Sequence, residues 1–165
     1  MENQYLDSEI DQLPTNYYSY ASFWRRFGAA MIDGLLVGAV NNVLQSVSGV
    51  GKHLQEIILE DPSDIDISNI ISVAGPIWAL GLGIQIAYFA YFESSAKQAT
   101  FGKQALGLIV TDMNGERITL GKAIIRYFAK FLSALILMIG YIMQPFTEKK
   151  QALHDMIAGT LVFKK

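Results

Sequence analysis

Apolar residues gather in three long runs along the chain, and polar segments separate these runs. The first run extends from Ala21 to Ser46, the second from Ile70 to Phe92 and the third from Ala123 to Phe146. About 20 helical residues, each rising ~1.5 Å, cross the hydrocarbon layer of a bilayer, which is roughly 30 Å thick. Each run is long enough for one crossing. The pattern therefore predicts an all-α membrane protein, a small helical bundle of three membrane segments.

The distribution of basic residues predicts the orientation of the bundle. Arg25 and Arg26 precede the first run, and further basic residues lie between the second and third runs, so the amino terminus and that connection are expected in the cytoplasm. Lysines after the third run also favour the cytoplasm, whereas three crossings would place them outside. Either Phe128–Gln144 enters the membrane and returns as a broken hairpin around Gly140, which we favour, or Gln151–Phe163 helps the chain to cross again. That last segment is too short to span alone.

Two polar segments have their own predicted structure. Residues 1–20 are acidic and carry no Lys or Arg, which indicates a polar amino-terminal tail before a membrane domain at residues 21–165. Farther along, Leu108–Asp112 and Glu116–Leu120 flank an Asn-Gly pair, which is typical of a tight turn. A short β-hairpin on the cytoplasmic surface is expected there. Leu161–Phe163 are expected to pair with Leu108–Val110.

The first apolar run carries two charges, Arg26 and Asp33. Seven residues make about two helical turns, so both side chains share one face, roughly 10 Å apart along the axis. An ionised aspartate near the bilayer centre costs about 2.5–3.5 kcal/mol, so this face is expected to contact protein. Arg26 is the nearest candidate partner for Asp33, and Gln85 of the second run is another. The same face is expected to hold small and polar residues: Ala30, Gly34, Gly38 and Asn41.

Composition excludes several classes of protein. Hydrophobic residues make up 52% of the chain, charged residues 17%, and the mean hydropathy is +0.29, as in membrane proteins. The chain has no cysteine, and its two histidines, His53 and His154, lie far apart, so no metal site is expected. No nucleophile has a neighbouring base and no basic stripe exists, so neither an enzyme, a cofactor nor nucleic acid is expected. The expected partner is the lipid bilayer.

Three motifs, in order, resemble the RDD family of small membrane proteins, and the likeness extends from about Ala21 to Phe163. The motifs are Trp24-Arg25-Arg26-Phe27-x-Ala29-x-x-x-Asp33, Thr100-x-Gly102-Lys103-x-x-Leu106-Gly107-Leu108-x-Val110 and Leu153-His154-Asp155-x-x-Ala158-Gly159-Thr160-x-Val162.

The resemblance implies a set of site residues. The family is named for an arginine and two aspartates, which match Arg26, Asp33 and Asp155 here. The resemblance also implies that some members exchange sodium, lithium or potassium for protons, while others look like accessory domains. Secondary candidates for the site are four polar residues in the motifs and apolar runs: His154, Gln85, Arg126 and Lys103.

Two functions are compatible with these residues in a bacterial cell membrane. In the first, Asp33, together with Asp155, alternately holds a proton and an alkali cation, since a carboxylate binds either. In the second, Arg26, Asp33 and Asp155 form a structural polar lock, and the protein is a non-transporting adaptor or assembly factor. The Gly34-x-x-x-Gly38 pair offers a contact for a homo-oligomer.

Overall fold

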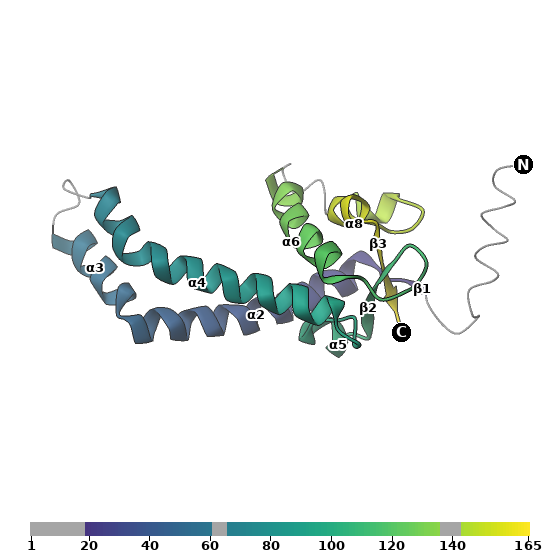
Figure 1. Ribbon diagram of the computed structural model, residues 1–165, viewed down its shortest axis with the longest axis horizontal. Helices are drawn as coiled ribbons and strands as arrows, with labels where there is room; N and C mark the ends of the chain where they lie inside the picture. The colour runs from purple at the N-terminus through teal and green to yellow at the C-terminus, as the bar shows by residue number, and fades with distance from the viewer. Residues whose placement is uncertain (1–18, 61–65, 136–142) are drawn as a thin grey trace, which may run out of the picture.

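Two long helices dominate the computed structural model, which describes residues 19–60, 66–135 and 143–165. Helix α2 (Phe23–Ser48) and helix α4 (Ile67–Ser94) run side by side in opposite directions, and α3 (Val50–Glu60) follows α2 at their far end (Figure 1). Both long helices have the length and apolar composition needed to cross a membrane. They correspond to the first and second apolar runs, and Pro76 lies inside α4 without ending it.

The remaining elements gather at the other end of this helical pair, which we call the sheet end (Figure 1). A three-stranded antiparallel sheet lies there in the order β1-β3-β2. Small and branched apolar side chains from the helices and the sheet form its core, among them Ala29, Ala90, Val110 and Val162. The elements of this end are β1 (Ser19–Tyr20), α5 (Phe101–Ala105), β2 (Leu108–Asp112), α6 (Leu120–Leu135), the 3-10 helix η1 (Gln144–Phe146), α8 (Leu153–Ala158) and β3 (Thr160–Lys164).

The turn of the predicted β-hairpin is confirmed, but the predicted second strand does not form. The Asp112 carboxylate accepts the backbone N–H groups of Asn114 and Glu116, both at 2.9 Å, and closes the turn. After the turn only an isolated bridge, Thr111 to Arg117, continues the pairing, because the chain leaves to begin α6. The full partner of β2 is β3, with Val110 opposite Val162, as the expected pairing of these segments required.

The third apolar run is described only in part. Helix α6 covers Leu120–Leu135, and Gly140, the expected point of return, lies outside the described residues. The Gln144 side chain donates a hydrogen bond of 2.9 Å to the carbonyl oxygen of Ala21, just before α2. The described parts of the run at its start and finish therefore both lie at the sheet end. Two helices of membrane-spanning length are present in the described chain, and the number of crossings stays a prediction.

Most of the predicted amino-terminal tail, residues 1–18, lies outside the described residues. Its last two residues, Ser19 and Tyr20, are β1 and pair with Lys164 and Phe163 of β3. The chain therefore joins the sheet directly before α2 begins.

Candidate functional site

The protein-facing side of α2 carries both charged residues of the first motif. Asp33 is buried together with Ala29 and Val37, and the Arg26 side chain is only 12% exposed. The expectation that this face contacts protein is confirmed for the charged residues. It is wrong for Ala30 and Gly34, which are exposed, because the buried stripe runs slightly to one side of them.

Asp33 is held by neutral hydrogen-bond donors and not by Arg26. One carboxylate oxygen accepts the Tyr88 hydroxyl and the Gly102 backbone N–H, both at 2.8 Å, and the other accepts the Thr100 hydroxyl at 2.6 Å. The predicted pairing with Arg26 is wrong, because Arg26 lies two turns away and engages Asp155. The predicted contact with Gln85 is also wrong, since Gln85 lines a separate cavity between α2 and α4.

Helix α5 reaches Asp33 because of one glycine. A Cβ atom at Gly102 would overlap the carbonyl oxygen of Ala29 and lie 2.9 Å from Cγ of Asp33. Only glycine lets the first turn of α5 lie this close to α2, so the Thr-x-Gly-Lys motif fits the surface around Asp33. The Tyr88 hydroxyl, which donates to Asp33, also accepts the Phe101 backbone N–H at 3.1 Å.

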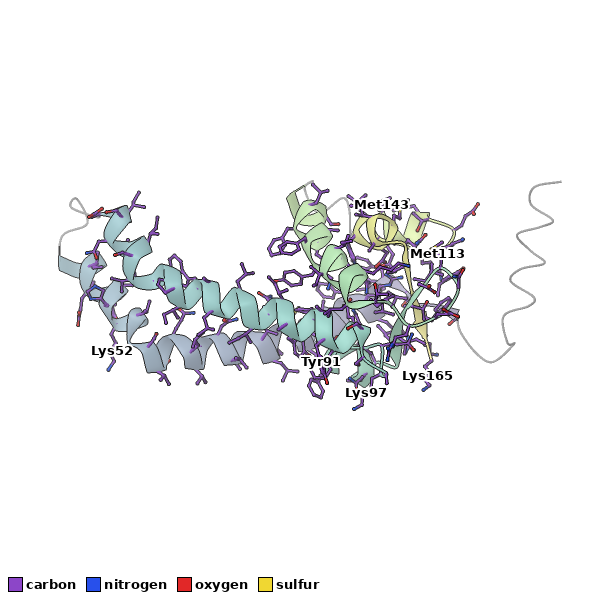
Figure 2. All side chains as sticks on the ribbon, viewed as in Figure 1. Lys52, Tyr91, Lys97, Met113, Met143 and Lys165 are labelled. Carbon is purple, nitrogen blue, oxygen red and sulfur yellow. The ribbon has the colours of Figure 1, made fainter. Side chains whose placement is uncertain are left out.

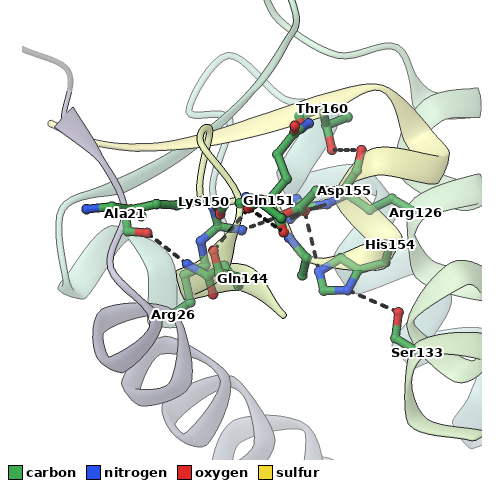
Figure 3. A network of polar contacts seen from close by, with 12 residues as sticks. Ala21, Arg26, Arg126, Ser133, Gln144, Lys150, Gln151, His154, Asp155 and Thr160 are labelled. Carbon is green, nitrogen blue, oxygen red and sulfur yellow. Dashed lines mark hydrogen bonds and ion pairs between the residues drawn. The ribbon is translucent and has the colours of Figure 1, made fainter. Parts of the chain in front are cut away.

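Asp155 lies between two arginines at the start of α8 (Figure 3). One of its oxygens accepts Nε of Arg126 at 3.0 Å and also Nη2, while the other accepts Nη1 of Arg26 and the Ala152 N–H at 3.1 Å. Arg26 also donates to the carbonyl oxygen of Lys150 at 2.7 Å. Burial alone would raise the pKa of Asp155, but the two guanidinium groups hold it well below its usual value. Asp155 is therefore ionised at neutral pH.

Glu93 is a third buried carboxylate, and sequence reasoning missed it. Arg126 donates to one of its oxygens at 3.0 Å, and Lys103 and Lys130 contact the other. The sequence does contain an indication of this site, since Glu93 is the first charged residue after the second apolar run. Arg126 thus joins two carboxylates in one charge network, which consists of Arg26, Glu93, Lys103, Arg126, Lys130 and Asp155.

Two of the secondary candidates are buried bases with shifted pKa values. Burial lowers the pKa of Lys103 to about 7, although the Glu93 carboxylate acts in the opposite direction. Burial also lowers the pKa of His154 to about 3, so its imidazole is neutral at pH 7. The ring lies between Ser133, 3.5 Å from Nδ1, and Asp155, 3.4 Å from Nε2.

The buried histidine predicts a loss of stability in mild acid. His154 has a pKa of about 3 when folded and ~6.5 when unfolded, so the unfolded chain binds more protons between these values. Stability should fall as the pH drops from about 6.5, by at most ~1.4 kcal/mol per pH unit for this group. His154→Gln should flatten thermal stability between pH 6.5 and pH 4, measured in detergent. His53→Gln, a change at a half-exposed histidine, is the control, and an equal flattening in both variants would contradict the assignment.

Arg26, Asp33 and Asp155, the arginine and two aspartates of the motifs, therefore occupy two neighbouring sites. Arg26 and Asp155 meet in the charge network, whereas Asp33 forms a separate site with Tyr88, Thr100 and Gly102. Within the described residues, no three His, Cys, Asp or Glu side chains are arranged to hold a metal ion. Together the two sites join α2, α4, α5, α6 and α8 through buried polar contacts.

Comparisons with known proteins give one family match and several bacterial relatives. The model of the RDD family matches residues 20–159. The uncharacterized protein YxaI of Bacillus subtilis is 35% identical over 149 residues, which cover 88% of this chain and 97% of that protein. The uncharacterized membrane protein YteJ of the same organism is 29% identical, covering 88% of this chain and 81% of its own length. A proline-rich antigen homolog of Mycobacterium tuberculosis is 27% identical, covering 92% of this chain and 65% of its own length. No solved structure matches the chain significantly.

Proposed function

The chain belongs to the RDD family of membrane proteins, and from this premise we propose that it is a non-transporting membrane adaptor or assembly factor. Helices α2 and α4 cross the bacterial cell membrane, and the sheet end is presented at the cytoplasmic surface. Basic residues concentrated at the sheet end support this orientation, among them Arg25, Lys97, Lys149 and Lys150. The buried contacts of Arg26, Asp33 and Asp155 act as a structural polar lock that fixes this end to the helical pair.

The proposal rests on how completely the buried carboxylates are engaged. Asp33 accepts three hydrogen bonds, one each from α4, from α5 and from the connection between them. Asp155 accepts bonds from two guanidinium groups, and Glu93 from a guanidinium and two ammonium groups. A carrier must release its carboxylate from one ligand in order to bind the next, whereas these groups are held by fixed donors. Such contacts stabilise one conformation.

A second candidate, exchange of alkali cations for protons, is favoured by one observation. The donors around Asp33 are two hydroxyl groups and a backbone N–H, all of them neutral. A fixed cation beside Asp33 would compete with a transported one, but Arg26 is engaged with Asp155. Asp33 is therefore the carboxylate at which exchange should be tested.

Proteoliposomes that contain a pH-sensitive dye distinguish the two functions. With the wild-type protein, gradients of sodium, lithium or potassium should move no more protons than in protein-free liposomes. Asp33→Asn should lower the yield of folded protein in detergent, whereas Glu56→Gln at an exposed position should not. Proton movement that disappears in Asp33→Asn at normal yield would establish exchange instead. Movement that persists in the variant would contradict the adaptor and also remove Asp33 from the transport mechanism.

A further inference from the structure

A cavity of about 330 Å³ lies between α2 and α4, away from both polar sites. Three carboxamide side chains line it, Asn41 and Gln45 from α2 and Gln85 from α4. Gly81, near the middle of α4, forms part of its wall, so the cavity lies well inside the segment that is long enough to cross a bilayer. Its other walls are apolar or aromatic and are formed by Leu44, Ile77, Trp78 and Leu82.

The carboxamides around this cavity are incompletely paired. Asn41 donates to the carbonyl oxygen of Val37 at 3.1 Å, and its own side-chain oxygen lies against Gly81, where a Cβ atom would overlap it. The side chains of Gln45 and Gln85 form no hydrogen bond with another residue of the described chain. Polar groups left unpaired in hydrocarbon are costly, because no water is available to them. Within the described residues, the cavity therefore offers polar groups that a further polar partner can pair.

We propose that a second copy of this chain docks on the face of α2 and α4 that carries Asn41, Gln45 and Gln85. A carboxamide both donates and accepts hydrogen bonds, so identical groups can pair reciprocally across a two-fold axis. Because the three groups are uncharged, the pairing brings no like charges together. Polar side chains of this kind stabilise the association of helices in membranes. The interface would be the same for an adaptor and for a carrier.

The backbone of α2 is open to such an approach. Gly34, Gly38, Asn41 and Gln45 recur at helical spacing and so lie along one face. Apart from the neighbouring backbone of α2 itself, no atom of the described residues lies within 4 Å of the position that a Cβ would take at Gly34 or Gly38. Only 11% of the residues in the apolar window of each long helix are buried, and their side chains project freely along most of the pair (Figure 2). Small residues at such positions let two helices approach closely.

Disulfide cross-linking in membranes tests this interface, because the chain has no cysteine of its own. Gly34→Cys and Leu35→Cys place a thiol at adjacent exposed positions of nearly equal depth, about 100° apart around α2. On oxidation, Gly34→Cys should form a covalent dimer at least several-fold faster than Leu35→Cys. Equal cross-linking of the two variants, or none in either, would overturn the proposed face.

Energy transfer between labelled copies in phosphatidylcholine vesicles tests the role of the carboxamides. The double variant Gln45→Leu, Gln85→Leu should associate about tenfold more weakly than the wild type, the size expected for lost polar contacts between membrane helices. Val43→Leu, a change at an exposed position on the opposite side of α2, should leave association unchanged. Unaltered association of the double variant would overturn the proposal. A wild type that stays monomeric would do so as well, and would leave the cavity to lipid or to a small polar solute.

Discussion

Asp155→Asn should lower the free energy of unfolding by about 3–5 kcal/mol, the usual cost of removing one partner from a buried ion pair. The side chain keeps its shape but loses its charge. Arg126, only 2% exposed, then retains Glu93 as its single counter-charge, and Arg26 loses its carboxylate partner. Chemical denaturation in detergent measures this loss, and size-exclusion chromatography should show a smaller folded fraction.

Glu56→Gln provides the matched control for the Asp155 variant. Glu56 is 71% exposed, and Nδ1 of His53 lies 3.9 Å from its carboxylate. An exposed pair of this kind contributes about 0–1 kcal/mol, so the control should remain close to the wild type. If Asp155→Asn were as stable as this control, the charge network would not be what holds α8 to α2 and α6.

Gly102→Ala should destabilise the protein by about 2–4 kcal/mol, since overpacking and a lost hydrogen bond to a charged group both contribute. The added methyl group overlaps the backbone carbonyl of Ala29, which cannot rotate away as a flexible side chain can. Helix α5 must therefore move off α2, and its N–H bond to Asp33 lengthens or breaks. Thermal unfolding in detergent measures the change.

Gly83→Ala is the control for the Gly102 variant, because it adds the same methyl group to α4 at an open position. Apart from the neighbouring backbone of α4, no atom of the described residues lies within 4 Å of a Cβ at Gly83. Alanine favours a helix over glycine by about 1 kcal/mol, so Gly83→Ala should be neutral or slightly stabilising. Similar behaviour of the two alanine variants would contradict the close packing of α5 on α2.

The sequence identified residues of the polar sites more reliably than it identified their partners. Helical spacing correctly predicted that Arg26 and Asp33 face protein, because it depends only on local geometry. Their partners come from other elements: Asp155 lies 129 residues after Arg26, and Thr100 lies 67 residues after Asp33. A periodic pattern relates residues only a few positions apart, so it cannot predict contacts between residues separated by so much sequence. Glu93 was missed for a related reason, since an acidic residue after an apolar run resembles an ordinary solvated helix end until α5 and α6 cover it.

In the third apolar run, length and hydropathy predict a membrane segment but do not predict which side of the helix protein covers. In α6 the buried side includes Arg126 and Ser133, whereas Phe128 and Phe131 are exposed. The pairing of β2 with β3 was predictable, because both segments are short runs rich in branched residues next to turn signals.

The position of β3 in the middle of the sheet has a consequence for synthesis on the ribosome. Both of its neighbours, β1 and β2, are translated earlier and have no ladder partner until β3 emerges. The same delay applies to Arg26 and Arg126, whose shared aspartate is made after both long helices. A nascent chain that stalls after Arg126 and before Asp155 therefore leaves Arg26 without its carboxylate partner and Arg126 with Glu93 as its single counter-charge.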